Sequence, residues 1–236
     1  MNTKTSSGRQ QNRAVTTSAK GLTKSVVHKK QSLPRTKNNT RLIIGLGNIG
    51  KQYADTGHNV GFLIVDQIAQ KLNIDKFEFN KKLKSLTAKT AINNIDIILA
   101  KPYGYMNESG IATQLLVKYY KINPTNLYVI HDEADLPFNK TKISIDSSSA
   151  GHKGIESIIQ TLKTKQILRF RVGIGPVINN TTPTITTQRN LKKIVLQTFT
   201  KAELDSLNIV AEKTMSALLM LLEDNISKAT NIFNAK

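Results

Sequence analysis

Apolar and polar positions divide the chain into a polar beginning and an ordered body. Residues 1–40 carry almost nothing aliphatic in periodic order, so burial cannot offset the entropy of folding and a disordered tail is predicted. From Arg41 the pattern changes, because an apolar run over residues 42–44 ends at Gly45, as expected of a buried strand before a glycine-rich turn. The folded domain is therefore predicted to span residues 41–236.

Within this body, the spacing of apolar residues predicts alternating strands and helices. Apolar residues three to four positions apart over residues 60–72 predict an amphipathic helix, and two apolar segments flanking Asn93-Asn94 predict a hairpin. Strands are predicted at residues 42–44, 86–91, 95–100, 127–130, 142–145 and 170–174, helices at 60–72, 111–120, 155–162 and 202–222, and a mobile loop at 179–187. This order predicts a single α/β domain, with a mixed, mostly parallel twisted sheet flanked by helices.

The net charge of the chain indicates the kind of partner that it binds. The 236 residues include 34 Lys and Arg against 16 Asp and Glu, a net charge of +18. Residues 1–40 hold nine of the basic residues, so the rest of the chain keeps 25 against 16 and is basic by itself. Such a surface favours a polyanion, nucleic acid first, through phosphate contacts, and the alternative is a lysine-rich surface that serves solubility.

Composition also excludes several classes of protein. There is no cysteine, which removes disulfide scaffolds, cysteine-ligated zinc, iron–sulfur clusters and thiol nucleophiles. The longest apolar stretch, residues 217–222, is far too short to cross a bilayer, so no membrane association is predicted. The acid-free tail, rich in Ser and Thr, resembles a transit peptide, although Lys outnumbers Arg. We expect a cytoplasmic protein, or a mitochondrial or plastid one if the tail is a transit peptide.

Polar residues that follow the apolar runs form four clusters. Ligands of α/β sheets bind at the carboxyl ends of strands, so these residues are the first candidates for a site. The clusters are Gly45-Leu46-Gly47-Asn48 with His58 and Asn59, then Met106-Asn107, His131-Asp132-Glu133, and Gly151-His152-Lys153-Gly154. Together they offer imidazoles, carboxylates, amides and a helix N-terminus.

Hydrolysis by a histidine–carboxylate pair fits these clusters best. A GxGxxG pattern begins at Gly45, but the helical periodicity starts too late for dinucleotide binding. No HExxH or GxSxG pattern occurs, and the neighbours His131 and Asp132 would point to opposite faces of a strand, which argues against a metal site. A neutral histidine can accept a proton from water while a carboxylate fixes its tautomer. The alternative for His58 is a purely structural role.

In this order and spacing, the clusters resemble the signatures of the bacterial-type peptidyl-tRNA hydrolase family. The likeness extends over residues 41–236 and includes Ile44–Asn48, Tyr53, His58–Gly61, Tyr105–Gly110, His131–Pro137, Gly151–Gly154, Arg169–Gly175 and Lys228–Asn231. The resemblance implies a monomeric α/β enzyme that hydrolyses the ester between a peptide and the 3′ end of tRNA, and so recycles tRNA from abandoned translation. It implies no cofactor and no metal.

The resemblance also implies roles for particular residues. His58 would activate the attacking water and Asp132 would orient His58. The implied substrate-binding residues are Asn48, Tyr53, Met106, Asn107, His152 and Lys153. Lys142 and Arg171 match positions that hold the 5′-phosphate of tRNA, which would account for the basic body.

Three positions depart from the family pattern. Ile49 replaces a proline, Gly57 replaces the arginine before the histidine, and Lys153 replaces an asparagine that would contact the substrate. A lysine offers three donors and a charge but no acceptor. We expect activity to survive these changes. The competing hypothesis is an RNA-binding relative of the family, resembling plastid splicing cofactors, that needs no hydrolysis.

Overall fold

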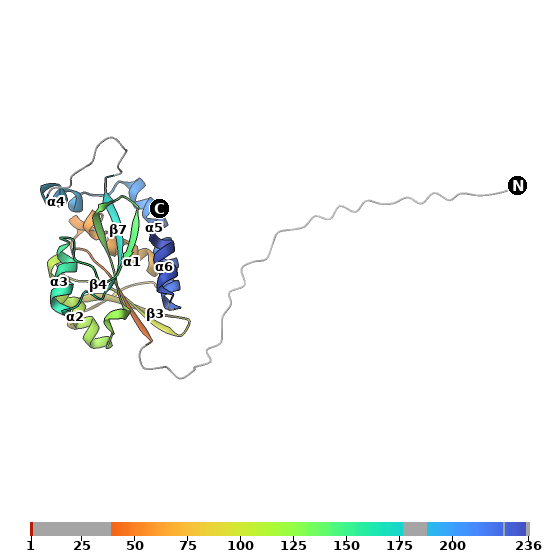
Figure 1. Cartoon of the computed structure of the whole chain (residues 1–236), viewed down its shortest axis with the longest axis horizontal. Helices are drawn as coiled ribbons and strands as arrows, with labels where there is room; N and C mark the ends of the chain where they lie inside the picture. The colour runs from red at the N-terminus through yellow and green to blue at the C-terminus, as the bar shows by residue number, and fades with distance from the viewer. Residues whose placement is uncertain (2–38, 177–187, 224, 235–236) are drawn as a thin grey trace. The chain divides into compact units, whose positions relative to one another are not determined.

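The computed structural model describes Met1 and residues 39–176, 188–223 and 225–234. The predicted disordered tail therefore lies outside the described residues, apart from Met1 and its last two positions, and so does the predicted loop at residues 179–187. The folded body is one seven-stranded sheet with helices on both faces (Figure 1), which confirms the predicted α/β class.

The sheet has the strand order β2-β3-β4-β1-β5-β7-β6. Its strands are β1 (Thr40–Gly45), β2 (Glu78–Asn80), β3 (Ser85–Ile92), β4 (Ile95–Pro102), β5 (Leu127–Pro137), β6 (Thr141–Ser144) and β7 (Leu168–Gly175). The central strands β4, β1, β5 and β7 pair in parallel, and the pairs β2–β3, β3–β4 and β6–β7 are antiparallel. The parallel centre brings the carboxyl ends of β1, β4 and β5 to one edge, where the polar clusters were predicted to meet.

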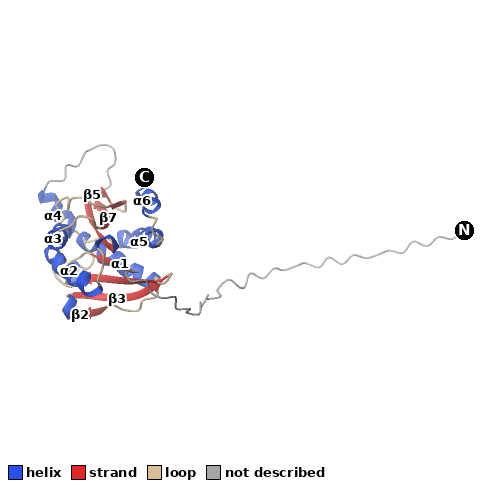
Figure 2. Ribbon diagram, turned by 60° about the horizontal axis from the view of Figure 1, so that its bottom comes forward, coloured by secondary structure: helices blue, strands red, loops and turns tan. Residues whose placement is uncertain are grey.

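Six α-helices surround the sheet in the described residues. They are α1 (Val60–Lys71), α2 (Ser109–Tyr120), α3 (Lys153–Leu162), α4 (Gln188–Leu196), α5 (Lys201–Leu222) and α6 (Ile226–Asn234). Single turns of 3-10 helix connect several of these elements: η1 (Lys51–Tyr53), η2 (Gly57–Asn59), η3 (Lys81–Leu83), η4 (Met106–Glu108) and η5 (Pro124–Asn126). Helices α2 and α3 cover one face of the sheet, and α1, α5 and α6 cover the other (Figure 2).

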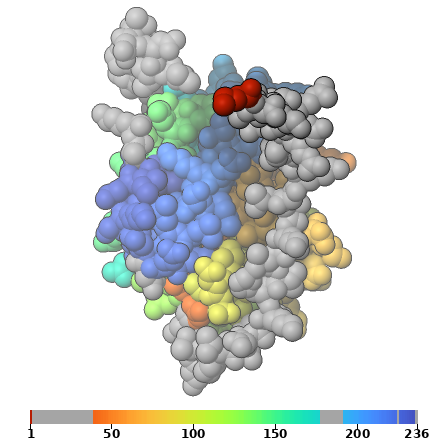
Figure 3. Space-filling view, turned by 90° about the vertical axis from the view of Figure 1, so that its right-hand side faces the viewer, coloured from red at the N-terminus to blue at the C-terminus, as the bar shows by residue number. Residues whose placement is uncertain are grey.

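Strand alternation divides the core into two layers. In β1, Ile43 packs with α1, α5 and α6, whereas Leu42 and Ile44 pack with α2 and α3. Because all three are at most 2% exposed, the strand reads as a continuous apolar run rather than as an alternation of apolar and polar residues. Figure 3 looks onto the face that α5 and α6 cover. None of the described helices is long and apolar enough to cross a membrane.

The hairpin prediction is confirmed, and three elements were missed. Asn93 and Asn94 join β3 to β4, both with positive φ, as a tight hairpin turn requires. The apolar pattern did not predict β2, α4 or α6. Strand β2 is three partly exposed residues without an apolar signal, and α6 buries only Ala229 and Phe233.

Candidate active site

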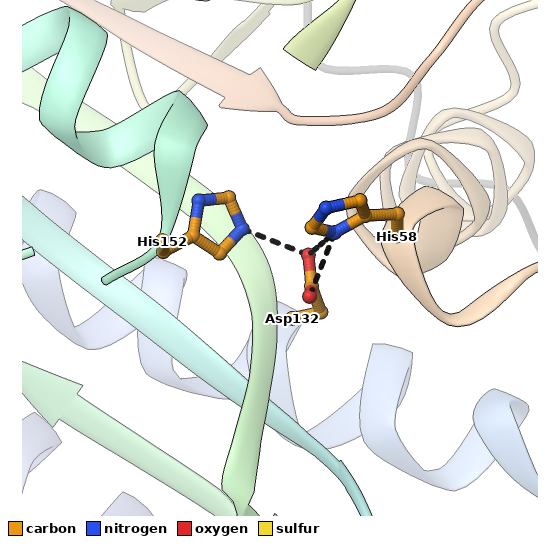
Figure 4. A group of neighbouring side chains, drawn as sticks. All are labelled: His58, Asp132 and His152. Atoms are coloured by element: carbon orange, nitrogen blue, oxygen red, sulfur yellow. Dashed lines mark hydrogen bonds and ion pairs between the residues drawn. The ribbon is translucent and has the colours of Figure 1, made fainter. Parts of the chain in front are cut away.

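The centre of the candidate site is Asp132 of β5, which lies between two imidazole rings. His58 Nδ1 is 3.0 Å from Asp132 Oδ1 and 2.9 Å from Oδ2. On the other side, His152 Nε2 is 2.8 Å from Asp132 Oδ1 (Figure 4). The carboxylate is 2% exposed and the His58 side chain 15%, so the acid is covered while one imidazole reaches the surface. We call these three residues the imidazole–carboxylate cluster.

His58 owes its position to close backbone contacts around the start of α1. A Cβ atom on Gly61 would lie 2.4 Å from Ile130 O and 2.5 Å from Leu46 N, so only glycine lets α1 approach β1 and β5 this closely. Gly57, where the family pattern has arginine, donates its N–H to Gln197 O at 3.1 Å. Its α-carbon faces Ile174 and the last turn of α4, which leaves little room for a side chain.

His152 serves two neighbours with its two ring nitrogens. Its Nδ1 accepts the N–H groups of Gly154 at 3.1 Å and Ile155 at 3.3 Å, which caps the N-terminus of α3. Since Nδ1 is an acceptor, the proton lies on Nε2 and is donated to Asp132. The resemblance implied a substrate-binding role for His152, and its hydrogen bonds in the structure are with Asp132 and with α3.

Asp132 keeps its negative charge inside the protein. Burial by itself would raise the pKa of this carboxyl, but electrostatic attraction and hydrogen bonds from His152 and then His58 outweigh burial and hold the pKa well below its usual range. An ionised carboxylate can only accept hydrogen bonds, so His58 must donate from Nδ1. His58 Nε2 is left with a lone pair that can accept a proton.

His131 is a further imidazole of the site, although the mechanism suggested by the sequence does not use it. Its Nδ1 lies 2.7 Å from the backbone oxygen of Asp132, and its ring meets the His152 ring edge to face at 4.7 Å. Burial, and then the neighbouring His152, lower its pKa well below the ordinary value. His131 is therefore neutral, and its buried Nε2 has no hydrogen-bond partner among the described residues.

Two asparagines fix the loop that follows β1. Asn59 Oδ1 accepts the Asn48 N–H at 2.8 Å, and Asn59 Nδ2 donates to Asn48 O at 3.0 Å. The side chain of Asn48 then accepts the Met106 N–H at 2.8 Å through Oδ1. Because a backbone N–H can only donate, this bond sets the orientation of the Asn48 amide and leaves Nδ2 as a donor for other groups.

The remaining predicted substrate residues lie around this loop with different exposure. Met106 is buried, and its sulfur would be 2.5 Å from a Cβ atom on Gly154. Asn107 is exposed on η4, and Lys153 is exposed at the first position of α3. Tyr53 is half-buried at the end of η1. No described hydrogen bond joins the side chains of Asn107, Lys153 or Tyr53 to the imidazole–carboxylate cluster.

The two predicted phosphate-binding residues are neighbours at one side of the sheet. Lys142 of β6 and Arg171 of β7 are paired in register. Lys142 is exposed, whereas Arg171 donates from Nε to Glu133 Oε2 at 2.8 Å. Arg169, two residues before Arg171, is buried and hydrogen-bonded to Ser147, and its pKa is lowered by burial and then by Arg171. Arg171 is thus held in place by an acid before any ligand binds.

Among the described residues, only the imidazole–carboxylate cluster could hold a metal ion. His58, Asp132 and His152 each offer one ligand atom, and these atoms lie within 4.8 Å of one another. Two imidazoles and a carboxylate suit a transition metal such as zinc. The hydrogen bonds of Asp132 account for the same arrangement with protons in place of a metal. The absence of a metal from the reaction stays a prediction.

The described body is thus an α/β protein with an imidazole–carboxylate pair at the carboxyl edge of its sheet, and comparison gives its family. Residues 42–236 match the family model of peptidyl-tRNA hydrolase. A peptidyl-tRNA hydrolase from Thermodesulfovibrio yellowstonii is 36% identical over 195 residues, 82% of this chain and 98% of the relative. One from Mycoplasmopsis agalactiae is 39% identical over 196 residues, 82% and 95% of the two chains.

A solved structure agrees with the sequence relatives. The crystal structure of peptidyl-tRNA hydrolase from Acinetobacter baumannii has a TM-score of 0.75 and 27% identity, covering 85% of this chain and 97% of its own. The chain belongs to the peptidyl-tRNA hydrolase family, which confirms the resemblance seen in the sequence.

Proposed function

We propose that this protein hydrolyses the ester bond between the peptide and tRNA of peptidyl-tRNA, with His58 as general base. The observation that carries the proposal is the 2.9 Å contact between His58 Nδ1 and the buried carboxylate of Asp132, which leaves Nε2 free to accept a proton. An imidazole titrates near neutral pH and is suited to this task. The relatives named above are peptidyl-tRNA hydrolases, which supplies the substrate class. The reaction would recycle tRNA from abandoned translation.

In the proposed reaction, water attacks the carbonyl carbon of the ester while His58 Nε2 takes up one of its protons. The negative charge that develops on the carbonyl oxygen is stabilised by amide donors, for which Asn48 Nδ2 and Asn107 are our candidates. The tetrahedral species collapses, the ribose oxygen leaves, and the imidazolium returns the proton to that oxygen. Asp132 stabilises the imidazolium and stays ionised throughout.

We assign the other predicted residues to substrate binding. Tyr53, Met106, His152 and Lys153 would border the peptide and the acceptor end of the RNA, with His152 acting through Asp132. Lys142 and Arg171 would bind a phosphate of the tRNA; the exposure of Lys142 and the bond from Glu133 to Arg171 support this, because a preorganised guanidinium loses less freedom on binding. We further propose that the enzyme acts as a monomer in the cytoplasm.

The test compares hydrolysis of a model peptidyl-tRNA by the wild type and by His58→Ala. We expect the variant to lose about 10²- to 10⁴-fold in kcat, because a positioned general base contributes that much. Gln70→Ala, an exposed change on α1, the helix that follows His58, is the matched control and should keep full activity. Equal rates for wild type and His58→Ala would overturn the assignment. The RNA-binding alternative would be favoured if the wild type hydrolysed no substrate and bound tRNA with the same affinity whether or not a peptide was attached.

A further inference from the structure

The active-site edge of the sheet continues beyond the imidazole–carboxylate cluster, toward β2. Ser85 of β3 is paired with Pro102, the last residue of β4, and Asn80 of β2 is paired with Ser85. The turn η3 between β2 and β3 therefore lies at the carboxyl end of β4, on the same edge as Asp132. Along this edge, the cluster lies around Asp132 of β5, with β7 and β6 on one side of that strand and β1, β4 and η3 on the other.

A pocket of about 310 Å³ lies on the β4 side, which we call the aromatic pocket. Its walls include Phe79, Tyr103, Tyr105 and Ile111, and its charged lining residues are Lys81, Lys84 and Glu108. The three aromatic side chains are 52%, 49% and 55% exposed, and the rings of Phe79 and Tyr103 are 4.6 Å apart. Exposed apolar groups that gather in this way mark a binding surface.

The backbone of the pocket is tied to the active-site loop. Tyr103 N donates to Lys84 O at 2.8 Å, which joins β4 to η3. Ile49 N, next to Asn48, donates to Gly104 O at 3.4 Å, and Tyr105 N donates to Glu108 Oε2 at 3.0 Å. Met106, whose N–H donates to Asn48 Oδ1, directly follows Tyr105. The pocket is therefore joined to the loop that carries Asn48.

We propose that the aromatic pocket binds a side chain of the peptide of peptidyl-tRNA, a few residues before the ester. The inference rests on the proposed function, which places the ester at His58 and the RNA phosphate at Lys142 and Arg171. The RNA then leaves the cluster toward β7 and β6. The peptide, attached to the other side of the ester, extends toward β4 and the pocket.

The walls of the aromatic pocket set the kind of side chain that it takes. Aromatic rings provide area for large apolar or aromatic side chains, and such burial gives selectivity of about tenfold or more over glycine. Lys81 and Lys84 outnumber Glu108, whose carboxylate already accepts the Tyr105 N–H, so the pocket disfavours the cationic ends of lysine and arginine. The enzyme should therefore prefer phenylalanine over glycine, and glycine over lysine, at the peptide position that reaches the pocket.

The experiment uses the full chain and a series of N-acetylated oligoglycyl-tRNAs with one residue replaced. A phenylalanine, or in a parallel series a lysine, stands one, two, three or four residues before the ester. For the wild type we expect kcat/KM to rise about tenfold for phenylalanine over glycine at one position of the series. The double variant Phe79→Ser/Tyr103→Ser should lose this preference. Tyr119→Ser, a change at an exposed tyrosine of α2 outside the pocket, should retain it.

Each other outcome has a defined meaning. If phenylalanine gives no advantage at any position, or if the double variant keeps the advantage, the pocket does not bind the peptide. If the double variant loses rate equally on all substrates and also loses affinity for uncharged tRNA, the aromatic rings bind RNA bases, which overturns the proposal. If the wild type hydrolyses none of the substrates, the proposed function itself fails, and this result is distinct from hydrolysis without a phenylalanine preference.

Discussion

A single carboxylate organises the residues around His58. Asp132 fixes the proton of each flanking ring on the nitrogen that faces it, and this fixed geometry is what a general base needs before substrate arrives. Removing only its charge, while keeping its shape, therefore separates the electrostatic contribution of Asp132 from its packing.

Asp132→Asn should lower kcat by about 10²- to 10⁴-fold, with little change in KM. The asparagine amide can donate to His58 Nδ1, which would move the ring proton to Nε2 and remove the free lone pair. Steady-state hydrolysis of peptidyl-tRNA measures the effect. Asp135→Asn, an exposed change in the same strand, is the control. A full rate in Asp132→Asn would show that the carboxylate does not set the tautomer.

The low pKa of Asp132 also makes stability depend on pH. Its folded pKa is depressed, so its contribution is fully present above the unfolded pKa of about 4 and is lost as pH falls through the folded value. The difference in free energy of unfolding between wild type and Asp132→Asn should therefore shrink as the pH falls below about 4. Urea unfolding at a series of pH values tests this. A difference that grows on acidification would contradict it.

At the scale of elements, the start of α3 and the orientation of Asp132 depend on the same ring. His152 caps α3 through Nδ1 and supports Asp132 through Nε2. The two roles can be separated, because asparagine is a good capping residue but is shorter than histidine.

His152→Asn and His152→Ala should lose the same activity, since both remove the N–H that Asp132 accepts. The alanine variant should be less stable than the asparagine variant by about 1 kcal/mol, the typical value of an N-cap. Thermal or urea unfolding and steady-state kinetics on the same preparations compare the two. Equal stability would mean that the Nδ1 contacts do not stabilise α3.

The contact between α1 and the sheet is equally specific. Gly61→Ala should destabilise the fold by about 1–3 kcal/mol, because its Cβ would press on the backbone of Ile130 and Leu46, which cannot rotate away. Gly104→Ala is the matched control: its nearest neighbour is the flexible end of Glu108, so the expected cost is below about 1 kcal/mol. Comparable melting temperatures for the two variants would contradict the tight approach of α1.

Elements with strong apolar periodicity could be predicted from the sequence, whereas elements that depend on tertiary contacts could not. The central strands and helices α1, α2, α3 and α5 follow from burial on fixed faces. Helix α6 buries two residues of nine, and the apolar signal of a segment that short is weak.

In the candidate site too, some contacts could be predicted from the sequence and others could not. His58 and Asp132 could be paired from the sequence through a family resemblance, and the structure brings them together. The hydrogen bond between His152 and Asp132 joins residues 20 positions apart, and the bond that Arg171 donates to Glu133 joins residues 38 positions apart. No local pattern encodes such contacts, because they depend on which strands become neighbours in the sheet. Asn59 lay within a predicted cluster, but its pairing with Asn48 required the fold.

At the scale of the whole molecule, charge governs the encounter with the substrate. A net charge of +18 favours any polyanion, so affinity for RNA should fall with salt through counterion release. The residues that contact phosphate are distinguished by how much each contributes to that dependence.

Lys142→Ala should reduce the slope of log kcat/KM against log salt concentration by slightly less than one unit, as expected for one lost phosphate contact. Lys118→Ala, an exposed change near the C-terminus of α2, should leave the slope unchanged. Initial rates with peptidyl-tRNA over a range of salt concentrations measure both. Identical slopes for the two variants would remove Lys142 from the RNA-binding surface.

In strand β5, the residues that support the proposed catalytic and RNA-binding groups are consecutive. Asp132 and Glu133 are consecutive, and side chains at consecutive strand positions point to opposite faces, so one acid supports the imidazoles and the next holds Arg171. A slide of β5 by one residue against β1 and β7 would turn both carboxylates to the opposite faces of the sheet and remove both contacts together. Redesign of this enzyme for another nucleic acid must therefore keep the register of β5 against β1 and β7 and change only side chains.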